Sequence, residues 1–170
     1  MHQTSIDNMK KAVKLLNLKD KMTVLDVGGR GLGEDRSYYH IFKDLAEMYH
    51  IADIVAGENV THVMPGPYTI PSSDNFYDLI VSGQTLEHVK NPFRLVAEMK
   101  RVLKLNGFMI LIAPSSGPRH DLIDCWRFMD DAFKAIAEET DLTVVEDWIY
   151  LEHPKSARVW NDHVFIGQKR

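Results

Sequence analysis

The sequence predicts an α/β fold with a mostly parallel sheet that carries one antiparallel strand near the C-terminus. Short apolar runs of strand length alternate with segments in which apolar residues recur at helical spacing. The run Phe108–Ala113 is apolar on both faces, as in a central strand covered by helices. The stretch 152–161 contains Pro154 and no helical periodicity, so the final run His163–Gly167 lacks a preceding crossover helix and should be antiparallel. Together these observations predict a single-domain, Rossmann-like, doubly wound sheet.

Length and composition limit the class of protein. A chain of 170 residues can bury a real core as one domain, with an N-terminal helix in 1–20 and the sheet and other helices in 21–170. The net charge of −4 gives no bulk indication of nucleic-acid binding. The single cysteine cannot form an internal disulfide, no apolar run is long enough to span a bilayer, and the N-terminus lacks a signal pattern. We therefore expect a cytoplasmic location, with neither nucleic acid nor membrane as a partner.

The elements follow in order from apolar spacing and turn residues. Helices are predicted over 5–18, 37–49, 91–103 and 129–139, and strands over 22–27, 50–55, 59–64, 78–82, 108–113, 142–148 and 163–167. The third helix has Asn91 as its N-cap, Pro92 at its first position and Gly107 as its expected end. The proline-rich stretch Met64–Pro71 and the segment 114–127 are predicted loops.

The first strand runs into a turn with four glycines in six positions, beginning at Gly28. Glycines let the chain turn sharply and bring backbone N–H groups close to a ligand. Asp53 follows 25 residues after Gly28, at the end of the predicted second strand. In an open α/β sheet, an acid at that place can accept hydrogen bonds from both hydroxyls of a ribose. The pair predicts a cofactor with a nucleoside part, and the alternatives are a plain turn and a solvated or capping Asp53.

The glycine spacing does not fit a dinucleotide. A G-x-G-x-x-G fingerprint fails in each frame, because Arg30, Glu34 or Arg36 occupies a position that requires glycine. The carboxylates of Glu34 and Asp35 at the expected helix start would also oppose a pyrophosphate. A nicotinamide oxidoreductase is therefore the weaker alternative.

Taken together, the residues from Met22 to Val145 resemble a class I S-adenosylmethionine-dependent methyltransferase. The segments that carry the resemblance are Val24–Gly28, Asp53–Gly57, Ile70–Asp78, Asp78–Ser82, Leu86–Val89 and Glu98–Lys104 with Gly107. The resemblance implies S-adenosyl-L-methionine as the cofactor, bound by Asp26, Gly28, Gly29, Arg30, Asp53, Ile54, Pro67, Tyr68, Ser82, Gly83 and Gln84.

Two departures from the family pattern concern the cofactor. The glycines stand one position later than usual, as in a subgroup with Val-Gly-Gly-Arg turns, which leaves the role of Arg30 open. Gly66 occupies the position of the acid that often meets the adenine amino group. Backbone around Pro67 and Tyr68 would then have to make that contact.

Candidate residues for the acceptor lie after the fourth and fifth predicted strands. Pro114–His120 followed by Asp124–Phe128 resembles a segment of small methyltransferases associated with glycan and secondary-metabolite clusters. We expect His88, His120 and Asp124 to be the catalytic candidates, and Trp126 and Arg127 to contact the substrate. The alternatives are a helix-start role for His88, a loop-structural role for His120, packing for Trp126, and a bracing role for the neighbouring Glu87. The remaining histidines show no metal-ligand spacing, so no metal is predicted.

The leading hypothesis is methyl transfer to an oxygen or nitrogen of a small molecule, with sugars, glycans and secondary metabolites as candidate acceptors. The alternative is a catalytically silent S-adenosylmethionine-binding partner or regulatory protein. Specificity would come from the N-terminal helix, the 114–127 loop and the 150–162 connection, or from a second subunit of a homodimer.

Overall fold

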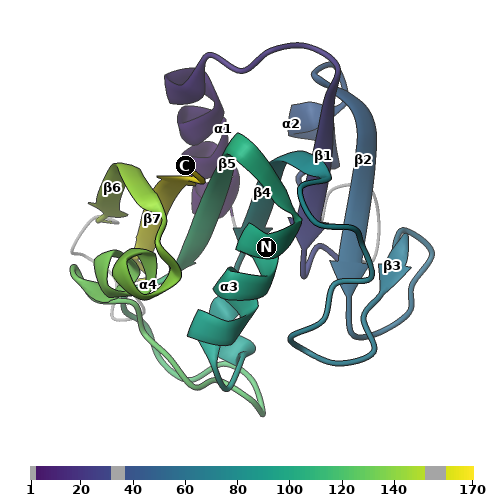
Figure 1. Cartoon of the computed structure of the whole chain (residues 1–170). Helices are drawn as coiled ribbons and strands as arrows, with labels where there is room; N and C mark the ends of the chain where they lie inside the picture. The colour runs from purple at the N-terminus through teal and green to yellow at the C-terminus, as the bar shows by residue number, and fades with distance from the viewer. Residues whose placement is uncertain (1–2, 32–36, 152–159) are drawn as a thin grey trace.

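The structure is a computed structural model that describes residues 3–31, 37–151 and 160–170 (Figure 1). Its elements are α1 (Gln3–Leu16), β1 (Met22–Val27), α2 (Tyr39–Phe42), β2 (Ala46–Asp53), β3 (His62–Val63), β4 (Tyr77–Gly83), the 3-10 turn η2 (Leu86–His88), α3 (Pro92–Val102), β5 (Leu103–Pro114), α4 (Ala132–Thr140), β6 (Thr143–Tyr150) and β7 (Asp162–Gln168).

Within the described residues, the strands form a seven-stranded sheet in the order β3-β2-β1-β4-β5-β7-β6. Neighbours from β3 to β5 are parallel, whereas β7 runs antiparallel to both β5 and β6. The predicted fold class, including the reversed last strand, is confirmed. The prediction of a reversed last strand rested on the connection 152–161, and its residues 152–159 lie outside the described part of the chain. Glu34 and Asp35, which the sequence places at a helix start, also lie outside it.

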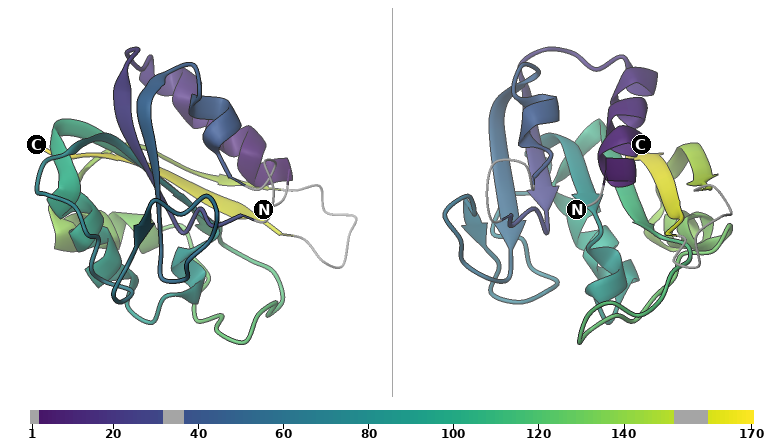
Figure 2. Two further views of the ribbon diagram at one scale, coloured as in Figure 1. Left: turned by 90° about the vertical axis from the view of Figure 1, so that its right-hand side faces the viewer. Right: turned by 180° about the vertical axis from the view of Figure 1, so that it is seen from behind.

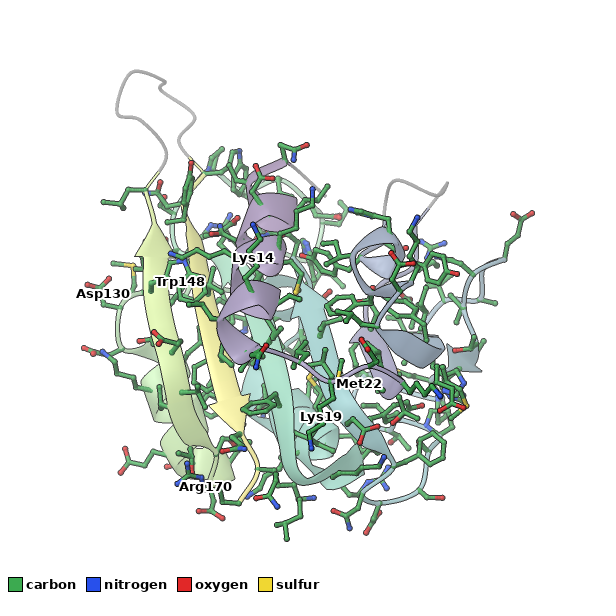
Figure 3. The ribbon with its side chains drawn as sticks, turned by 90° about the horizontal axis from the view of Figure 1, so that it is seen from above. Lys14, Lys19, Met22, Asp130, Trp148 and Arg170 are labelled. Atoms are coloured by element: carbon green, nitrogen blue, oxygen red, sulfur yellow. The ribbon has the colours of Figure 1, made fainter. Side chains whose placement is uncertain are left out.

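Helices cover both faces of the sheet, which explains why its central strands are apolar on both sides (Figure 2). Met9 of α1 and Phe42 of α2 pack on one face, and Leu95 of α3 and Phe133 of α4 belong to the cluster on the other. Alternate residues of the central strands enter the two clusters, as the two-residue period of a strand requires. Seen from above, α1 crosses the sheet beside Trp148 of β6 (Figure 3), and Lys11 Nζ lies 4.4 Å from the centre of the Trp148 ring.

The start of α3 follows its sequence signals, but its end does not. Asn91 Oδ1 accepts a hydrogen bond from the backbone N–H of Arg94 at 3.1 Å, and Pro92 is the first helical residue. The helix ends at Val102, and β5 begins at Leu103, so the prediction that Gly107 ends it is wrong. A Cβ at Gly107 would lie 2.9 Å from the carbonyl oxygen of Asp78. Gly107 therefore allows β4 and β5 to approach each other.

The predicted helix over 37–49 is also wrong in most of its length. Only four of these residues form α2, and β2 begins at Ala46 instead of His50. Its ladder with β1 extends from Met22 opposite Ala46 to Val27 opposite Ala52. This pairing satisfies backbone groups along all of β1, and that long-range gain outweighs a local helical spacing.

Candidate functional site

The glycine turn lies at the carboxyl end of β1. The arrowheads of β1 and β2 in Figure 1 point to the edge where the loop between β5 and α4 also lies. Gly28 has a φ of +80°, a conformation that favours glycine, and its N–H donates to the carbonyl of Ala52 at 2.8 Å. A Cβ at Gly28 would overlap Thr85, and one at Gly29 would overlap the carboxylate of Asp26. Both positions thus require glycine.

Asp26 lies beneath this turn and is almost completely buried. The Tyr49 hydroxyl donates to its Oδ2 at 2.7 Å. Burial raises the pKa of Asp26 to about 6, against the lowering effect of hydrogen bonds from Tyr49 and from the backbone of Tyr38. The buried carboxylate of Asp26 therefore packs against the glycine turn at Gly29 and supports it.

Asp53 ends β2, the strand next to the glycine turn. Its Oδ1 accepts from the backbone N–H of Val55 at 2.9 Å, which fixes the side chain in a local turn while it stays partly exposed. Ile54 beside it is 57% exposed. The predicted ribose-binding acid thus lies at the same sheet edge as the glycines.

Asn59, which no sequence motif indicates, joins the glycine turn to the loop after β2. Asn59 Nδ2 donates to the carbonyl of Gly29 at 3.3 Å, and its Oδ1 is buried with no hydrogen-bond partner among the described residues. The Arg30 side chain packs against the loop after β2, because a Cβ at Gly57 would lie 3.1 Å from Cγ of Arg30.

Ser82 and Gly83 at the end of β4 have clear packing roles. The Ser82 hydroxyl donates to the carbonyl of Val27 at 2.8 Å and thereby ties β4 to β1. A Cβ at Gly83 would overlap the hydroxyl of Tyr38. Tyr38 is fully buried and shares a 2.7 Å hydrogen bond with the hydroxyl of Ser5 in α1. The N-terminal helix thus reaches the site through Tyr38, which no sequence motif indicates.

Gln84 follows with a φ of +57°. Its Nε2 donates to Asp162 Oδ1 at 2.9 Å, and Asn8 Nδ2 lies 3.5 Å from the other oxygen of that carboxylate. The side chain of Gln84 thus anchors the turn after β4 to β7.

The adenine side predicted from the resemblance contains Tyr68 and an open space. The Tyr68 hydroxyl accepts from the backbone N–H of Asn91 at 3.1 Å, and the Arg94 guanidinium lies 4.5 Å from the ring centre, so Tyr68 braces the start of α3. Pro67 beside it is exposed. A Cβ at Gly66 would meet no heavy atom of the described residues within 4 Å. A larger side chain would fit at Gly66.

Three polar side chains meet on the acceptor side. One ligand-type atom of each of Glu87, His88 and His120 lies within 4.8 Å of the other two. The His88 and His120 rings are 5.0 Å apart, and His120 also contacts the ring of Trp160 at 4.9 Å. Glu87 is fully buried, and burial raises its pKa to about 7 against the lowering effects of its own backbone N–H and of His88. The structure therefore brings two of the predicted catalytic residues together and adds Glu87.

Asp124, the third predicted catalytic residue, positions His120. Its Oδ2 accepts from both the backbone N–H and the Nδ1 of His120 at 3.0 Å. Hydrogen bonds from the Arg127 guanidinium hold the pKa of Asp124 well below its usual range. With only 1% of its side chain exposed, Asp124 lies beneath His120 and away from solvent.

Arg127 does not fit the prediction of a substrate anchor. Its guanidinium donates to both oxygens of Asp124 and to the carbonyls of Gly117, Pro118 and Trp126. A guanidinium has five N–H donors, and these five bonds leave none for a substrate. Arg127 therefore holds the loop between β5 and α4 in shape. Trp126 donates its Nε1 proton to the carbonyl of Val89 at 2.9 Å and leaves its ring 42% exposed, so its prediction as a pocket wall stays open.

A hollow of about 480 Å³ lies at the opposite edge of the sheet from the candidate site. It is lined by 16–22, Asp78 and 104–108, at the amino ends of β1 and β4. Ligands of open α/β sheets bind at the carboxyl ends of the strands, so this hollow is separate from the candidate site.

Comparisons with known proteins agree with this geometry. Residues 42–111 match a family model described as a methyltransferase domain. An uncharacterized methyltransferase from Mycobacterium avium is 33% identical over 97 residues, which cover 52% of this chain and 38% of that protein. The chain thus spans less than two fifths of the length of the curated relatives it matches.

Solved structures share the fold at low identity. The YcgJ protein from Bacillus subtilis has a TM-score of 0.75 with 14% identity and covers 99% of both chains. The 1,6-didemethyltoxoflavin-N1-methyltransferase from Burkholderia thailandensis, with bound S-adenosylhomocysteine, has a TM-score of 0.73 with 15% identity, covering 97% of this chain and 78% of that one.

The chain thus shares its fold with solved methyltransferases, and its residues 42–111 match the model of a methyltransferase domain. Within the described residues, no helix combines the length and apolar character needed to cross a membrane.

Proposed function

We propose that this protein transfers the methyl group of S-adenosyl-L-methionine to an oxygen or nitrogen of a small molecule. The observation that carries the proposal is that three features lie at the ends of adjoining strands, namely the glycine turn after β1, Asp53 at the end of β2 and Gly83–Gln84 at the end of β4. All three lie at the sheet edge where ligands of open α/β folds bind. The Burkholderia relative, whose fold this chain shares, is described as an N1-methyltransferase with S-adenosylhomocysteine bound.

The residues present fit this cofactor. Asp53 has a partly exposed carboxylate that can accept hydrogen bonds from the ribose hydroxyls. Gly28 and Gly29 have no side chains, so the backbone of the turn is open to the methionine part of the cofactor. The open space at Gly66 lies where the resemblance expects the adenine. When bound, S-adenosylmethionine supplies a methyl group already activated by its sulfonium. The protein then has to hold the acceptor in line with that methyl group and exclude water.

The acceptor is proposed to meet the Glu87–His88–His120 cluster beside the loop that Arg127 holds in shape. These side chains suit an acceptor hydroxyl or amine, because imidazole nitrogens and carboxylate oxygens can take up a proton. A sugar or secondary metabolite fits that chemistry. Completion of the pocket by a second copy of the chain is part of the proposal, and size-exclusion chromatography with light scattering tests it.

The test is methyl transfer from labelled S-adenosylmethionine to a panel of sugars, glycans, phenols and amines. A matched Gly28→Val variant should lose cofactor binding, because Thr85 leaves no space for a side chain, while its circular dichroism stays native. Transfer by the wild type that is absent in this variant supports the proposal. Binding of S-adenosylmethionine in calorimetry without transfer to any acceptor supports the regulatory alternative instead, and NADH binding in its place would support an oxidoreductase.

A further inference from the structure

The cluster of Glu87, His88 and His120 has features that a proton-transfer role alone does not explain. Both histidines are held by the same kind of bond. His88 Nδ1 lies 2.5 Å from the carbonyl oxygen of Ile123, and His120 Nδ1 lies 3.0 Å from Oδ2 of Asp124. A carbonyl oxygen and an ionised carboxylate can only accept, so Nδ1 carries the proton in each ring. In the neutral form of both histidines, Nε2 therefore has a free lone pair.

This arrangement is the one that metal-binding histidines use. A ligating imidazole typically donates its second ring N–H to a carboxylate or a backbone carbonyl, which fixes its tautomer and its orientation. His88 has the carbonyl partner and His120 the carboxylate partner. Asp124 is itself fixed by Arg127 through hydrogen bonds to both of its oxygens. The backbone N–H of Cys125 also donates to the carbonyl of Glu87 at 2.7 Å, which ties the loop to the η2 turn.

Glu87 is the second, independent observation. Its side chain is fully buried, and neither carboxylate oxygen has a hydrogen-bond partner in another of the residues that the structure describes. Nε2 of His88 lies 3.6 Å from Oε1, too far for a hydrogen bond. A buried carboxylate without partners is strongly unfavourable, and coordination of a cation removes that penalty.

We propose that Glu87, His88 and His120 form a binding site for a divalent transition metal ion. One ligand-type atom of each of the three residues lies within 4.8 Å of those of the other two. Metal–nitrogen and metal–oxygen bonds of about 2.0–2.2 Å require ligand separations of roughly 3–4 Å, so binding draws the cluster together by about an ångström. Two imidazoles with one carboxylate suit Zn²⁺, Co²⁺ or Fe²⁺ better than Mg²⁺, which prefers oxygen ligands.

The ion gives the site a role in acceptor activation, and this step rests on the proposed function. Three protein ligands leave at least one coordination position open for an acceptor oxygen. A hydroxyl bound there loses its proton to solvent more easily, because the metal lowers its pKa. Its oxygen then forms the new bond to the methyl carbon while the carbon–sulfur bond breaks, and the sulfur keeps the electron pair as S-adenosylhomocysteine.

Metal binding is tested on the full chain after dialysis against chelator. Titration with Co²⁺ should give visible d–d absorption that saturates near one equivalent, and Zn²⁺ should displace the Co²⁺ whereas Mg²⁺ should not. His120→Ala and Glu87→Gln should each weaken Co²⁺ binding by at least tenfold. A matched His40→Ala variant, which removes an exposed histidine on α2, should bind as the wild type does. Circular dichroism of each variant confirms that it is folded.

The outcomes separate the metal site from the proposed function. Absence of d–d absorption in the wild type, or equal Co²⁺ affinity in the wild type, His120→Ala and Glu87→Gln, overturns the site and leaves an ion pair of Glu87 and His88. S-adenosylhomocysteine binding is measured by calorimetry on the metal-free protein. If the metal-free wild type does not bind it, that result counts against the cofactor proposal and not against the metal site. Methyl transfer that is unchanged by chelation overturns the role in acceptor activation. Zn²⁺-dependent transfer, lost with His120→Ala while S-adenosylhomocysteine still binds, supports it.

Discussion

Replacement of Asp53 tests the cofactor half of the site most directly. The carboxylate already holds the backbone N–H of Val55 through Oδ1 at 2.9 Å. Asp53→Asn keeps an oxygen acceptor for Val55 but removes the charge and one acceptor, whereas Asp53→Ala removes both the turn bond and the ribose contacts. The comparison of the two variants therefore separates loss of ligand contacts from loss of local structure.

The expected magnitude follows from the bonds that would be lost. Hydrogen bonds to a charged group contribute about 1.5–3 kcal/mol each when buried, and partial exposure of Asp53 reduces that figure. We expect cofactor binding to weaken by roughly 1–3 kcal/mol in Asp53→Ala, which corresponds to a Kd about 5 to 150 times higher. Asp53→Asn should show most of this loss.

The assay is calorimetric titration with S-adenosylhomocysteine, which binds without turnover. Asp44→Asn serves as the control, because Asp44 is an exposed acid between α2 and β2, near the opposite end of the same strand. Thermal melting of all variants checks that they remain folded. A Kd within twofold of wild type in both Asp53 variants would remove this residue from the site and refute the reasoning.

Three further predictions concern other parts of the structure. Gly66→Asp places a carboxylate in open space on the adenine side, so the Kd for S-adenosylhomocysteine should fall by about tenfold relative to Gly66→Ala, and equal values in calorimetry would contradict this. The pKa of Asp26 is about 6 in the folded protein against 3.8 for the free group, so the folded state keeps a proton that the unfolded state releases. Its contribution to the free energy of unfolding should fall by on the order of 2–3 kcal/mol from pH 4 to pH 6, and urea denaturation of Asp26→Asn should lack that part of the fall. Asn91→Ala removes the N-cap of α3 and should lower the free energy of unfolding by about 1 kcal/mol in urea, with an unchanged value refuting the cap's contribution.

Elements defined by local signals were predictable from the sequence. The bounds of β1 match the prediction, because a short apolar run is followed directly by glycines, which end the strand in a turn. The start of α3 follows from Asn91 and Pro92, whose capping and first-turn roles depend on neighbours within one helical turn. The antiparallel β7 follows from the difficulty of a parallel connection without a crossover helix.

Elements decided by distant partners were not predictable in the same way. The apolar residues around 46–49 have helical spacing, yet these residues form part of β2 because they pair with β1 along its whole length. Gly107 resembles a helix stop, but its lack of a side chain is needed where β5 approaches the carbonyl of Asp78. In both cases the competing contact lies more than twenty residues away, outside any local pattern.

The candidate site divides along the same line. Its cofactor half consists of the ends of strands that follow one another in the chain, so the spacing of Gly28 and Asp53 in the sequence is enough to predict it. Its acceptor half joins the η2 turn to a loop more than thirty residues away, and the sequence indicates His88 and His120 singly without showing that they meet.

Arg127 explains why that meeting is reliable. Its five hydrogen bonds fix the loop, and Asp124, which it holds, in turn orients His120 over the buried Glu87. An arginine that the sequence suggests for substrate binding thus acts on the site through the loop. The guanidinium has no donor left for Glu87, whose carboxylate has no hydrogen-bond partner in another of the described residues, and this agrees with the cation site proposed for the Glu87–His88–His120 cluster.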